Sequence, residues 1–538
     1  MQKSLFQEFC CNTSIHGIQY LEKKSNLERL IWTVVLCTSI IGCVFYIGQI
    51  YQKWDEKPVI LSFAEGYTPI WEIPFPAITI CPQIKATPER LNFSQELEAF
   101  INKTSWTNDT DRIDDMLAMA QVCDQSFLDN MFYLKLHLPN KTSNLSYSTL
   151  IEDLALTEDD VMGHCKVRNN LDDCEDWFLR SMTEEGICFT FNGLDQSDLL
   201  RPQFLQNLNG WKAPSTNWSR ESGYPPSAGF EAFPFRALGA SPQEGLVMVL
   251  ASDIFENDFD CRSATKGFKV FIHPPDVYPR VMKSYILVQE NYEVNIVLKP
   301  HVITTSSKLR KTSPERRQCI FNQDRQLEYF QIYNQKNCEL ECLTRYTLQR
   351  CGCVRFSMPH TNDTAECEMS NIKCVIEAEK ELTEMSLPND EGKPTFWASC
   401  NCLPACISYQ YEFEVTESES SKTSGRRSSF KQLEDYGGDI TRLNIYFKKS
   451  SFLASRRSEL YTLTDFVANC GGLLGLFMGF SLVSVIELLY YCLLRPALNL
   501  WNKWKKSDRQ PSLPEPVDDE GPTKVSMVTF PLSNGLSY

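Results

Sequence analysis

Two long apolar segments, one near each end of the chain, constrain its fold more than any other feature. The segment at residues 466–494 is long enough to cross a bilayer and carries a single charge, Glu487. Small residues let helix backbones approach closely, and an ionisable group inside a membrane indicates an ion or substrate path. We therefore expect this segment to be a helix that packs against copies of itself around something polar. Its small residues include Gly471, Gly472, Gly475 and Gly479.

The other apolar segment, residues 30–50, contains no charged residue and can also span a bilayer. A cleaved signal peptide is the alternative, but its apolar region is about 7–15 residues long and follows a short basic start. Here the segment is longer and follows a polar leader, so we interpret it as a retained span. Basic residues lie between each span and the nearer end of the chain, which predicts that both termini are cytoplasmic. These residues are Lys3, Lys23, Lys24, Arg29, Arg495, Lys503, Lys505, Lys506 and Arg509.

This topology places residues 51–460 outside the cell, and two other patterns agree with it. Most cysteines lie in this region, where an oxidising compartment lets disulfides persist. Acceptor sequences for N-glycans also occur there. We predict glycosylation at Asn92, Asn102, Asn108, Asn140, Asn144, Asn217 and Asn362. The cysteines outside the region, which we expect to remain thiols, are Cys10, Cys11, Cys37, Cys43, Cys470 and Cys492.

The chain therefore divides into a cytoplasmic leader, a first membrane helix, an extracellular domain, a second membrane helix and a cytoplasmic tail that we expect to be disordered. The boundaries are residues 1–29, 30–50, 51–460, 461–494 and 495–538. A net charge of −15 without a basic stripe argues against nucleic-acid binding. We find no catalytic or phosphate-binding motif, so we expect neither an enzyme nor a cofactor.

The extracellular region has the composition of a mixed α and β fold. Residues 87–165 are rich in helix formers, which predicts a protruding helical subdomain with helices at 111–122 and 149–162. Elsewhere, β-branched and alternating runs end at turn residues. They predict strands at 71–82, 186–192, 245–252 and 267–273.

A cysteine-rich block, residues 319–406, is the most specific pattern in the chain. It opens with Cys-x3-Cys and closes with Cys-x-Cys-x3-Cys, which favours a ladder of nested disulfides. Cys338 and Cys342 lie one helical turn apart, so both can pair with Cys402 and Cys400 on a returning strand. Zinc is the alternative for such clusters. The oxidising compartment, the lack of Cys-x2-Cys and the single histidine of the block argue against it, and we expect no metal site.

Together these features resemble the degenerin/epithelial sodium channel superfamily, the amiloride-sensitive sodium channels. The resemblance extends from about residue 10 to about residue 500 and is strongest to the insect pickpocket branch. It rests on the two spans, the cysteine block and the sequences His16-Gly17, Phe75-Pro-Ala-Ile-Thr-Ile-Cys81 and Gly479-Phe480-Ser481.

The resemblance implies an α+β membrane protein whose two transmembrane helices flank a large disulfide-rich extracellular domain. This domain has a β-sheet core, a finger-like helical region at 87–165 and a thumb-like region at 319–406. The resemblance also implies a homo- or heterotrimer with related subunits in the plasma membrane, sodium as the permeant ion and amiloride as the blocker. It does not identify the extracellular ligand or mechanical stimulus that opens the channel.

By the same resemblance, Gly479, Phe480 and Ser481 form the selectivity filter, where carbonyls and hydroxyls replace part of the hydration shell of an ion. The bulky Phe480 is expected to face a neighbouring helix, and it leaves the preference for sodium over potassium open. Three copies of Glu487 form an inner cation ring. The remaining assignments are an outer pore and gate at Ala468, Asn469, Gly471, Gly472 and Gly475, and a gating motif at His16 and Gly17.

The resemblance also implies the disulfide pairing of the extracellular domain. The implied pairs are Cys81–Cys188, Cys165–Cys174, Cys319–Cys406, Cys338–Cys402, Cys342–Cys400, Cys351–Cys374 and Cys353–Cys367. Cys123 and Cys261 remain, and we expect them to form an eighth bridge.

Several residues also have plainer interpretations. The glycines of the second span can serve helix contact alone, and Glu487 can extend to the inner surface and pair with Arg495. Asp276 follows the predicted strand 267–273, roughly where acid-sensing relatives have part of an acidic cluster. We interpret its side chain as a solvated loop carboxylate. For the whole chain, the alternatives are a two-span trimeric ATP-gated channel and a non-conducting two-span scavenger-type receptor.

Overall fold

The computed structural model forms two compact units: a terminal unit, Met1–Glu56 with Tyr461–Tyr538, and a central unit, Lys57–Leu460. The predicted glycan site Asn108 and the predicted disordered tail after residue 507 lie outside the described residues. The structure describes residues 5–22, 25–56, 59–102, 110–134, 138–168, 170–206, 208–252, 258–262, 266–385, 400–419 and 439–507.

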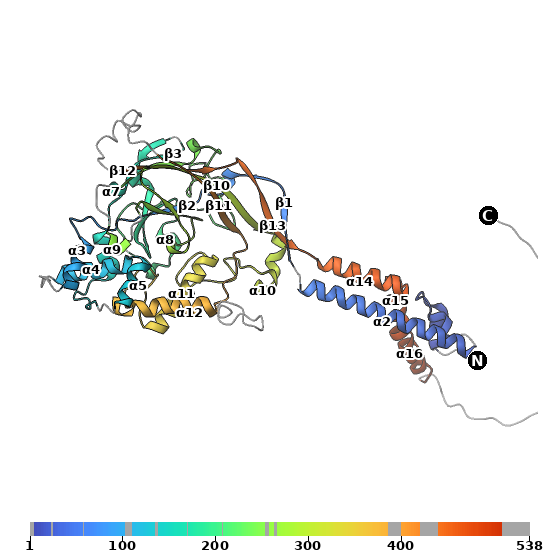
Figure 1. Ribbon diagram of the computed structural model, residues 1–538. Coiled ribbons are helices and arrows are strands. Elements are labelled where there is room, and N and C mark those ends of the chain that lie inside the picture. Colours follow the sequence, from blue (N-terminus) through green and yellow to red (C-terminus); the bar gives the residue numbers. More distant parts are fainter. Residues whose placement is uncertain are drawn as a thin grey trace, which may run out of the picture. The chain divides into compact units, whose positions relative to one another are not determined.

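The terminal unit is built of helices from both ends of the chain (Figure 1). α2 and the stretch Leu482–Asn502 are each long and apolar enough to cross a membrane, and Leu463–Met478 is a shorter apolar helix. The first part of the predicted disordered tail is helical, because residues 497–507 contain neither glycine nor proline. The helices are α1 (Leu5–Asn12), η1 (Ile18–Glu22), α2 (Asn26–Glu56), α14 (Leu463–Met478), α15 (Leu482–Leu489), the π-helical turn η11 (Tyr490–Leu494) and α16 (Arg495–Ser507).

The larger sheet of the central unit has the strand order β1-β13-β10-β12-β7-β3-β4, and β11 pairs with β10. Its longest strand, β10, runs antiparallel to β11 and parallel to β12. Alternate residues Val294, Ile296 and Leu298 of β10 are fully buried, as the two-residue period of a strand requires. The strands are β1 (Val59–Pro69), β3 (Met162–Val167), β4 (Asn170–Asp173), β7 (Leu246–Ser252), β10 (Tyr292–Thr305), β11 (Ser408–Glu419), β12 (Asp439–Phe447) and β13 (Ser451–Glu459).

The smaller sheet has the order β5-β6-β2-β8-β9. The strands predicted at 186–192, 245–252 and 267–273 are confirmed by β6, β7 and β8. In 71–82 the strand begins only at Ala77, because Pro74 and Pro76 have no N–H for a ladder. The strands are β2 (Ala77–Pro82), β5 (Phe178–Thr183), β6 (Gly186–Phe191), β8 (Phe268–His273) and β9 (Ile286–Val288).

The helical subdomain predicted between the first strands contains α3 (Phe93–Asn102), α4 (Thr110–Val122), α5 (Gln125–Tyr133), α6 (Tyr147–Leu154) and α7 (Glu158–Val161). The helix predicted at 111–122 is confirmed by α4. The helix predicted at 149–162 is confirmed in part, by the end of α6 and by α7, but it is wrong as one continuous helix. It breaks at 155–157, where Thr157 starts α7 with a capping box, and Met162 already pairs with Leu250 in the sheet. Shorter helices are α8 (Gln196–Leu199), α9 (Phe259–Arg262) and α10 (Pro314–Arg317).

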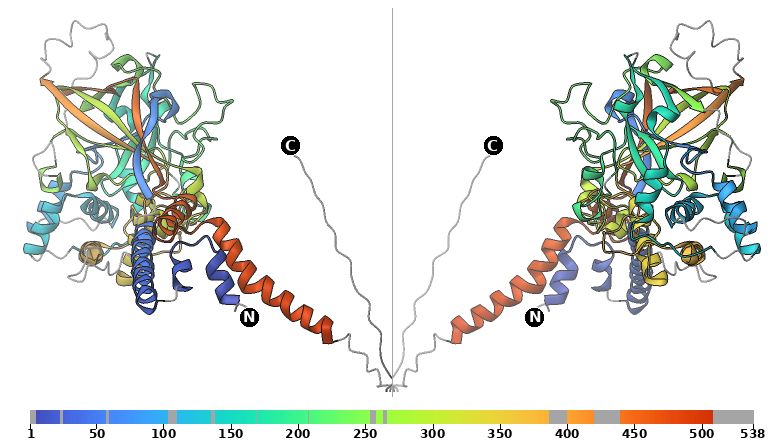
Figure 2. Two further views of the ribbon diagram at one scale, coloured as in Figure 1. Left: turned by 90° about the vertical axis from the view of Figure 1, so that its right-hand side faces the viewer. Right: turned by 90° about the vertical axis from the view of Figure 1, so that its left-hand side faces the viewer.

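The cysteine-rich block forms α11 (Gln335–Cys351) and α12 (Ile372–Met385), which lie across the central unit from the larger sheet (Figures 1 and 2). Cys338 and Cys342 lie on α11 as predicted. Their partners do not lie on a returning strand, since Cys402–Pro404 is irregular and β11 begins only at Ser408. Every cysteine of the block is in a disulfide, which leaves no thiolate there for zinc.

The structure forms the seven disulfides that the family resemblance implied, and it also forms the eighth bridge expected from the two remaining cysteines, Cys123–Cys261. Cys123 ends the turn after α4 and Cys261 lies in α9, so the eighth bridge joins two helical segments that are 138 residues apart in sequence.

We expect peptide mapping of the intact protein under non-reducing conditions to recover a peptide pair joined through Cys123 and Cys261. The pair should separate after reduction, as should the Cys81–Cys188 pair, which serves as the internal control. Alkylation of both thiols before reduction would show that the eighth bridge does not form.

Candidate functional site

The second apolar segment is not one continuous helix, because it breaks at Gly479, Phe480 and Ser481. Gly479 ends α14 in the left-handed conformation, at φ +61°, which favours glycine. Ser481 is the N-cap of α15, and its hydroxyl accepts a hydrogen bond from the Ser484 N–H. The predicted filter residues therefore lie in a non-helical turn between a C-cap and an N-cap. The partly buried Phe480 donates its N–H to the Leu474 carbonyl, 3.2 Å away.

The leader of the chain folds onto this break and brings the His16-Gly17 motif to it. The His16 N–H donates to the carbonyl of Met478, the last residue of α14, at 3.0 Å. The His16 ring occupies the space beside Gly479, where a Cβ atom would overlap its Nδ1. Gly17 is also left-handed, at φ +88°, and lies against Leu36 of α2. Gly479 is thus required both by its backbone conformation and by contact with His16.

Glu487 is bound by the same leader segment. Its Oε2 accepts hydrogen bonds from the Ser14 N–H at 2.8 Å and from the Thr13 hydroxyl at 3.2 Å. Ser14 also bonds through its hydroxyl to Ser484, one turn before Glu487, at 2.7 Å. The alternative pairing of Glu487 with Arg495 does not occur in the structure, since Arg495 pairs with Glu8 at 2.6 Å.

One face of α14 packs against α2. Phe466 lies 5.5 Å from the ring of Trp54, and Phe477 lies 5.9 Å from the ring of Tyr46. The ring of Phe477 also fits against Gly42, where a Cβ atom would come within 3.1 Å.

Another part of the α14 surface carries small residues, and no other described segment of the terminal unit packs against it. Around Gly471 and Gly472 a Cβ atom would meet nothing within 4 Å. Three of the predicted gate residues, Ala468, Gly472 and Gly475, share one helix face by their spacing of four and three residues. The exposed predicted gate residues are Ala468, Asn469, Gly471, Gly472 and Gly475.

In the central unit, Asp276 is not the solvated loop carboxylate that we expected. It is fully buried and pairs with the guanidinium of Arg220, which donates from Nε at 2.6 Å. Its backbone carbonyl accepts hydrogen bonds from the side chains of Asn334 and Asn337 at the start of α11. Asp276 therefore links the loop after β8 to the cysteine-rich block.

The structure shows whether the predicted glycan acceptor asparagines lie on the surface. Within the described part of the chain, each predicted acceptor asparagine is exposed, as glycosylation requires. These acceptors are Asn92, Asn102, Asn140, Asn144, Asn217 and Asn362.

Sequence reasoning missed the polar residues that attach the leader to the break, namely Thr13, Ser14 and Ser484. A serine or threonine in a short turn gives no local signal of a partner more than 400 residues away. The Ser481-x-x-Ser484 spacing is a weak sign of an N-cap inside an apolar segment, and it could have indicated the helix break.

Comparisons with known protein families and with individual proteins agree with one another. Residues 9–491 match the family model described as amiloride-sensitive sodium channel. Pickpocket protein 28 of Drosophila melanogaster is 28% identical over 503 residues, which cover 90% of this chain and 77% of the relative. Sodium channel protein Nach of the same species is 25% identical, covering 90% and 86%. Human acid-sensing ion channel 2 is 22% identical, covering 91% and 86%.

Proposed function

The chain belongs to the amiloride-sensitive sodium channel family, and we propose that three such subunits form an amiloride-sensitive, sodium-permeable pore gated through the extracellular domain. Because the chain belongs to this family, we no longer interpret it as an ATP-gated channel or a scavenger-type receptor. The relative named sodium channel protein Nach supports sodium as the permeant ion.

We further propose that the protein crosses the plasma membrane twice, with both termini in the cytoplasm and the central unit outside. The basic residues at both chain ends support this topology. So do the disulfides of the central unit and the exposed acceptor asparagines, because both modifications belong to the secretory pathway.

The observation that carries the proposed function is the helix break beside an uncovered small-residue surface. Three copies of α14 can approach closely along Ala468, Gly472 and Gly475, since no large side chain separates their backbones. Such an assembly would place three Gly479-Phe480-Ser481 turns together, where their carbonyls and hydroxyls could replace part of the hydration shell of an ion. Glu487 would then contribute three carboxylates below the turn, which attract cations and repel anions.

Replacing Ala468 with valine is expected to raise the resting sodium current several-fold, because three larger side chains would hold the α14 helices apart. Whole-cell current is measured in oocytes that express the variant or the unchanged chain at equal surface density. Leu453→Val, at an exposed leucine of the central unit, is the matched control and should leave the resting current unchanged.

The same cells test the proposed selectivity. Replacing external sodium with a large organic cation should abolish the inward current of the Ala468→Val channel, and amiloride should block it. Inward current that survives the replacement, or an Ala468→Val channel at the surface without extra current, would argue against this pore.

A further inference from the structure

Three cationic side chains surround one buried carboxylate in the central unit. Glu185, in the turn between β5 and β6, is 1% exposed and pairs with Lys85, Arg262 and Lys269. Lys269 Nζ lies 2.7 Å from Glu185 Oε1, and Lys85 Nζ lies 3.3 Å from Oε2. Arg262 also pairs with Oε2. Lys269 lies in β8, Arg262 in α9 and Lys85 in the segment after β2. The cluster therefore connects two strands of the smaller sheet with the neighbouring helix α9.

The cluster contains more positive than negative charge. The second carboxylate is Asp124, which lies 3.2 Å from Arg262 and 4.0 Å from Lys269 and is 21% exposed. Within the described part of the chain, three cations are therefore paired with two carboxylates, one of which reaches solvent. Among the other described groups, Arg355 interacts electrostatically with Glu185 and with the neighbouring Glu184. Two neutral groups also contact the cluster: the Gln83 amide oxygen, which accepts from Arg262, and the Tyr285 ring, 4.8 Å from Lys269 Nζ.

Lys85 is the cation whose hydrogen bonds are not satisfied. Its side chain is 6% exposed, and the contact of Nζ with Glu185 Oε2, at 3.3 Å, is its only ion pair among the described residues. Arg262 and Lys269, by contrast, each donate hydrogen bonds to Glu185. Burial, together with repulsion by Arg262 and Lys269, lowers the pKa of Lys85 to about 7. A buried ammonium that shares its one carboxylate with two other cations is costly unless it loses its proton or gains a further anion.

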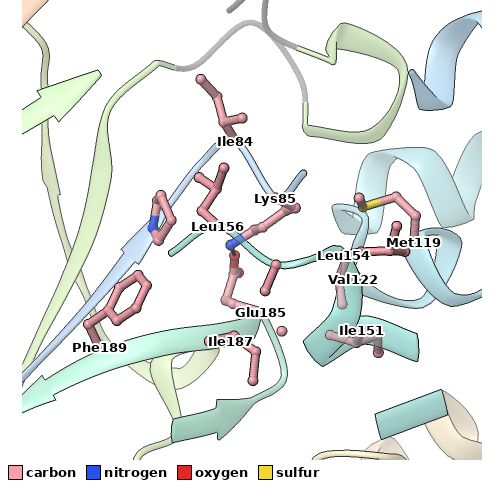
Figure 3. A pocket seen from close by; sticks show the side chains of 13 residues that line it. Ile84, Lys85, Met119, Val122, Ile151, Leu154, Leu156, Glu185, Ile187 and Phe189 are labelled. Atoms are coloured by element: carbon pink, nitrogen blue, oxygen red, sulfur yellow. Dashed lines mark ion pairs between the residues drawn. The ribbon is translucent and has the colours of Figure 1, made fainter. Parts of the chain in front are cut away.

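A small cavity lies beside this ammonium group (Figure 3). Its volume is about 20 Å³, enough for one solvent-sized particle. Lys85 and Glu185 provide its polar groups. The other walls are apolar, with Met119 from α4, Ile151 from α6 and Phe189 from β6.

We propose that this cavity binds a small monovalent anion of chloride size against the Lys85 ammonium group. The anion would balance the third cation of the cluster and accept the hydrogen bonds that Lys85 cannot make to protein groups. One negative charge suits the excess of one cation among the paired described residues, and the small volume of the cavity excludes a larger oxyanion.

Binding of the anion is linked to the protonation of Lys85. The anion favours the charged amine, so it raises the pKa of Lys85, and anion affinity rises as the pH falls through 7. The walls of the cavity come from the helical subdomain and from the smaller sheet, so the bound anion stabilises their contact. The Cys123–Cys261 disulfide lies directly beside Asp124 and Arg262 in sequence and fixes both segments at the cluster.

The test is thermal unfolding of the purified full-length protein in detergent, in sodium chloride or in sodium gluconate. At pH 6 chloride should raise the melting temperature by about 2–4 °C, the shift expected for a weakly bound ligand in excess. At pH 8.5 the difference should shrink. Lys85→Met should remove the chloride effect at both pH values. Lys336→Met, at an exposed lysine of α11 paired with Glu339, is the matched control and should retain it.

Equal melting temperatures of the unchanged protein in the two salts at pH 6, or an undiminished chloride effect in Lys85→Met, would overturn the proposal. If Lys85→Met does not fold, bromide provides an independent measurement on the unchanged protein. Anomalous scattering from crystals grown in bromide should show a peak beside Lys85 Nζ at pH 6, and the absence of that peak would also overturn it.

Discussion

Replacing Gly479 with alanine is expected to abolish most of the sodium current while leaving the protein at the cell surface. The left-handed conformation costs an L-residue about 1–2 kcal/mol, before any steric overlap is counted. Here the added methyl group would also overlap the His16 ring. Both effects disfavour the turn between α14 and α15 and displace the leader from it, so the proposed constriction cannot keep its geometry.

The current is measured in the Ala468→Val background, where we expect a resting current without any stimulus. Gly48→Ala is the matched control, because Gly48 lies in α2 without a left-handed backbone and its Cβ would meet nothing within 4 Å. That variant should conduct normally. A Gly479→Ala channel that conducts as well as Gly48→Ala would show that the turn and its contact with His16 are not needed for conduction.

The Asp276→Asn substitution is expected to destabilise the central unit by about 3–5 kcal/mol, because it leaves the buried Arg220 guanidinium without its countercharge. A loss of this size is a large part of the stability of a typical domain, so less protein should reach the surface. Surface biotinylation and the thermal unfolding of purified protein measure the two effects.

Two further variants make this result specific to the buried pair. Glu339→Gln removes one partner of an exposed pair with Lys336 on α11 and should cost no more than about 1 kcal/mol. Combining Asp276→Asn with Arg220→Met removes both charges and should recover part of the stability that Asp276→Asn loses. Equal stability of Asp276→Asn and Glu339→Gln would mean that Arg220 does not depend on Asp276.

Local sequence patterns predicted those helices and strands whose formation depends mainly on neighbouring residues in the sequence. The alternation at 267–273 predicted β8, because a strand with one distinct face has a two-residue period. The helix pattern at 149–162 missed an interruption, because Ala155 is extended and Thr157 caps a second short helix. Seven disulfide pairs came from family resemblance, since cysteine spacing alone leaves many pairings open, and the eighth came from the two cysteines that remained.

The candidate site was only partly predictable, because it joins the two ends of the chain. The sequence indicated His16, Gly17, Gly479 and Glu487 one by one, but nothing local to them shows that His16 lies beside Gly479. The prediction that Asp276 is solvent-exposed was wrong for the same reason. Its ion-pair partner, Arg220, is distant in sequence, so the local sequence after the strand does not indicate burial.

The most direct test of the pore is chemical modification of a cysteine placed at Ser481, in the Ala468→Val background. A charged, membrane-impermeant thiol reagent should block most of the sodium current in the Ser481→Cys channel, because the modified side chain would lie in the ion path. The Ala468→Val channel alone is the control for Cys470 and Cys492, which are not in disulfides. Equal currents before and after the reagent in a Ser481→Cys channel shown to be modified would contradict a sodium path through this turn.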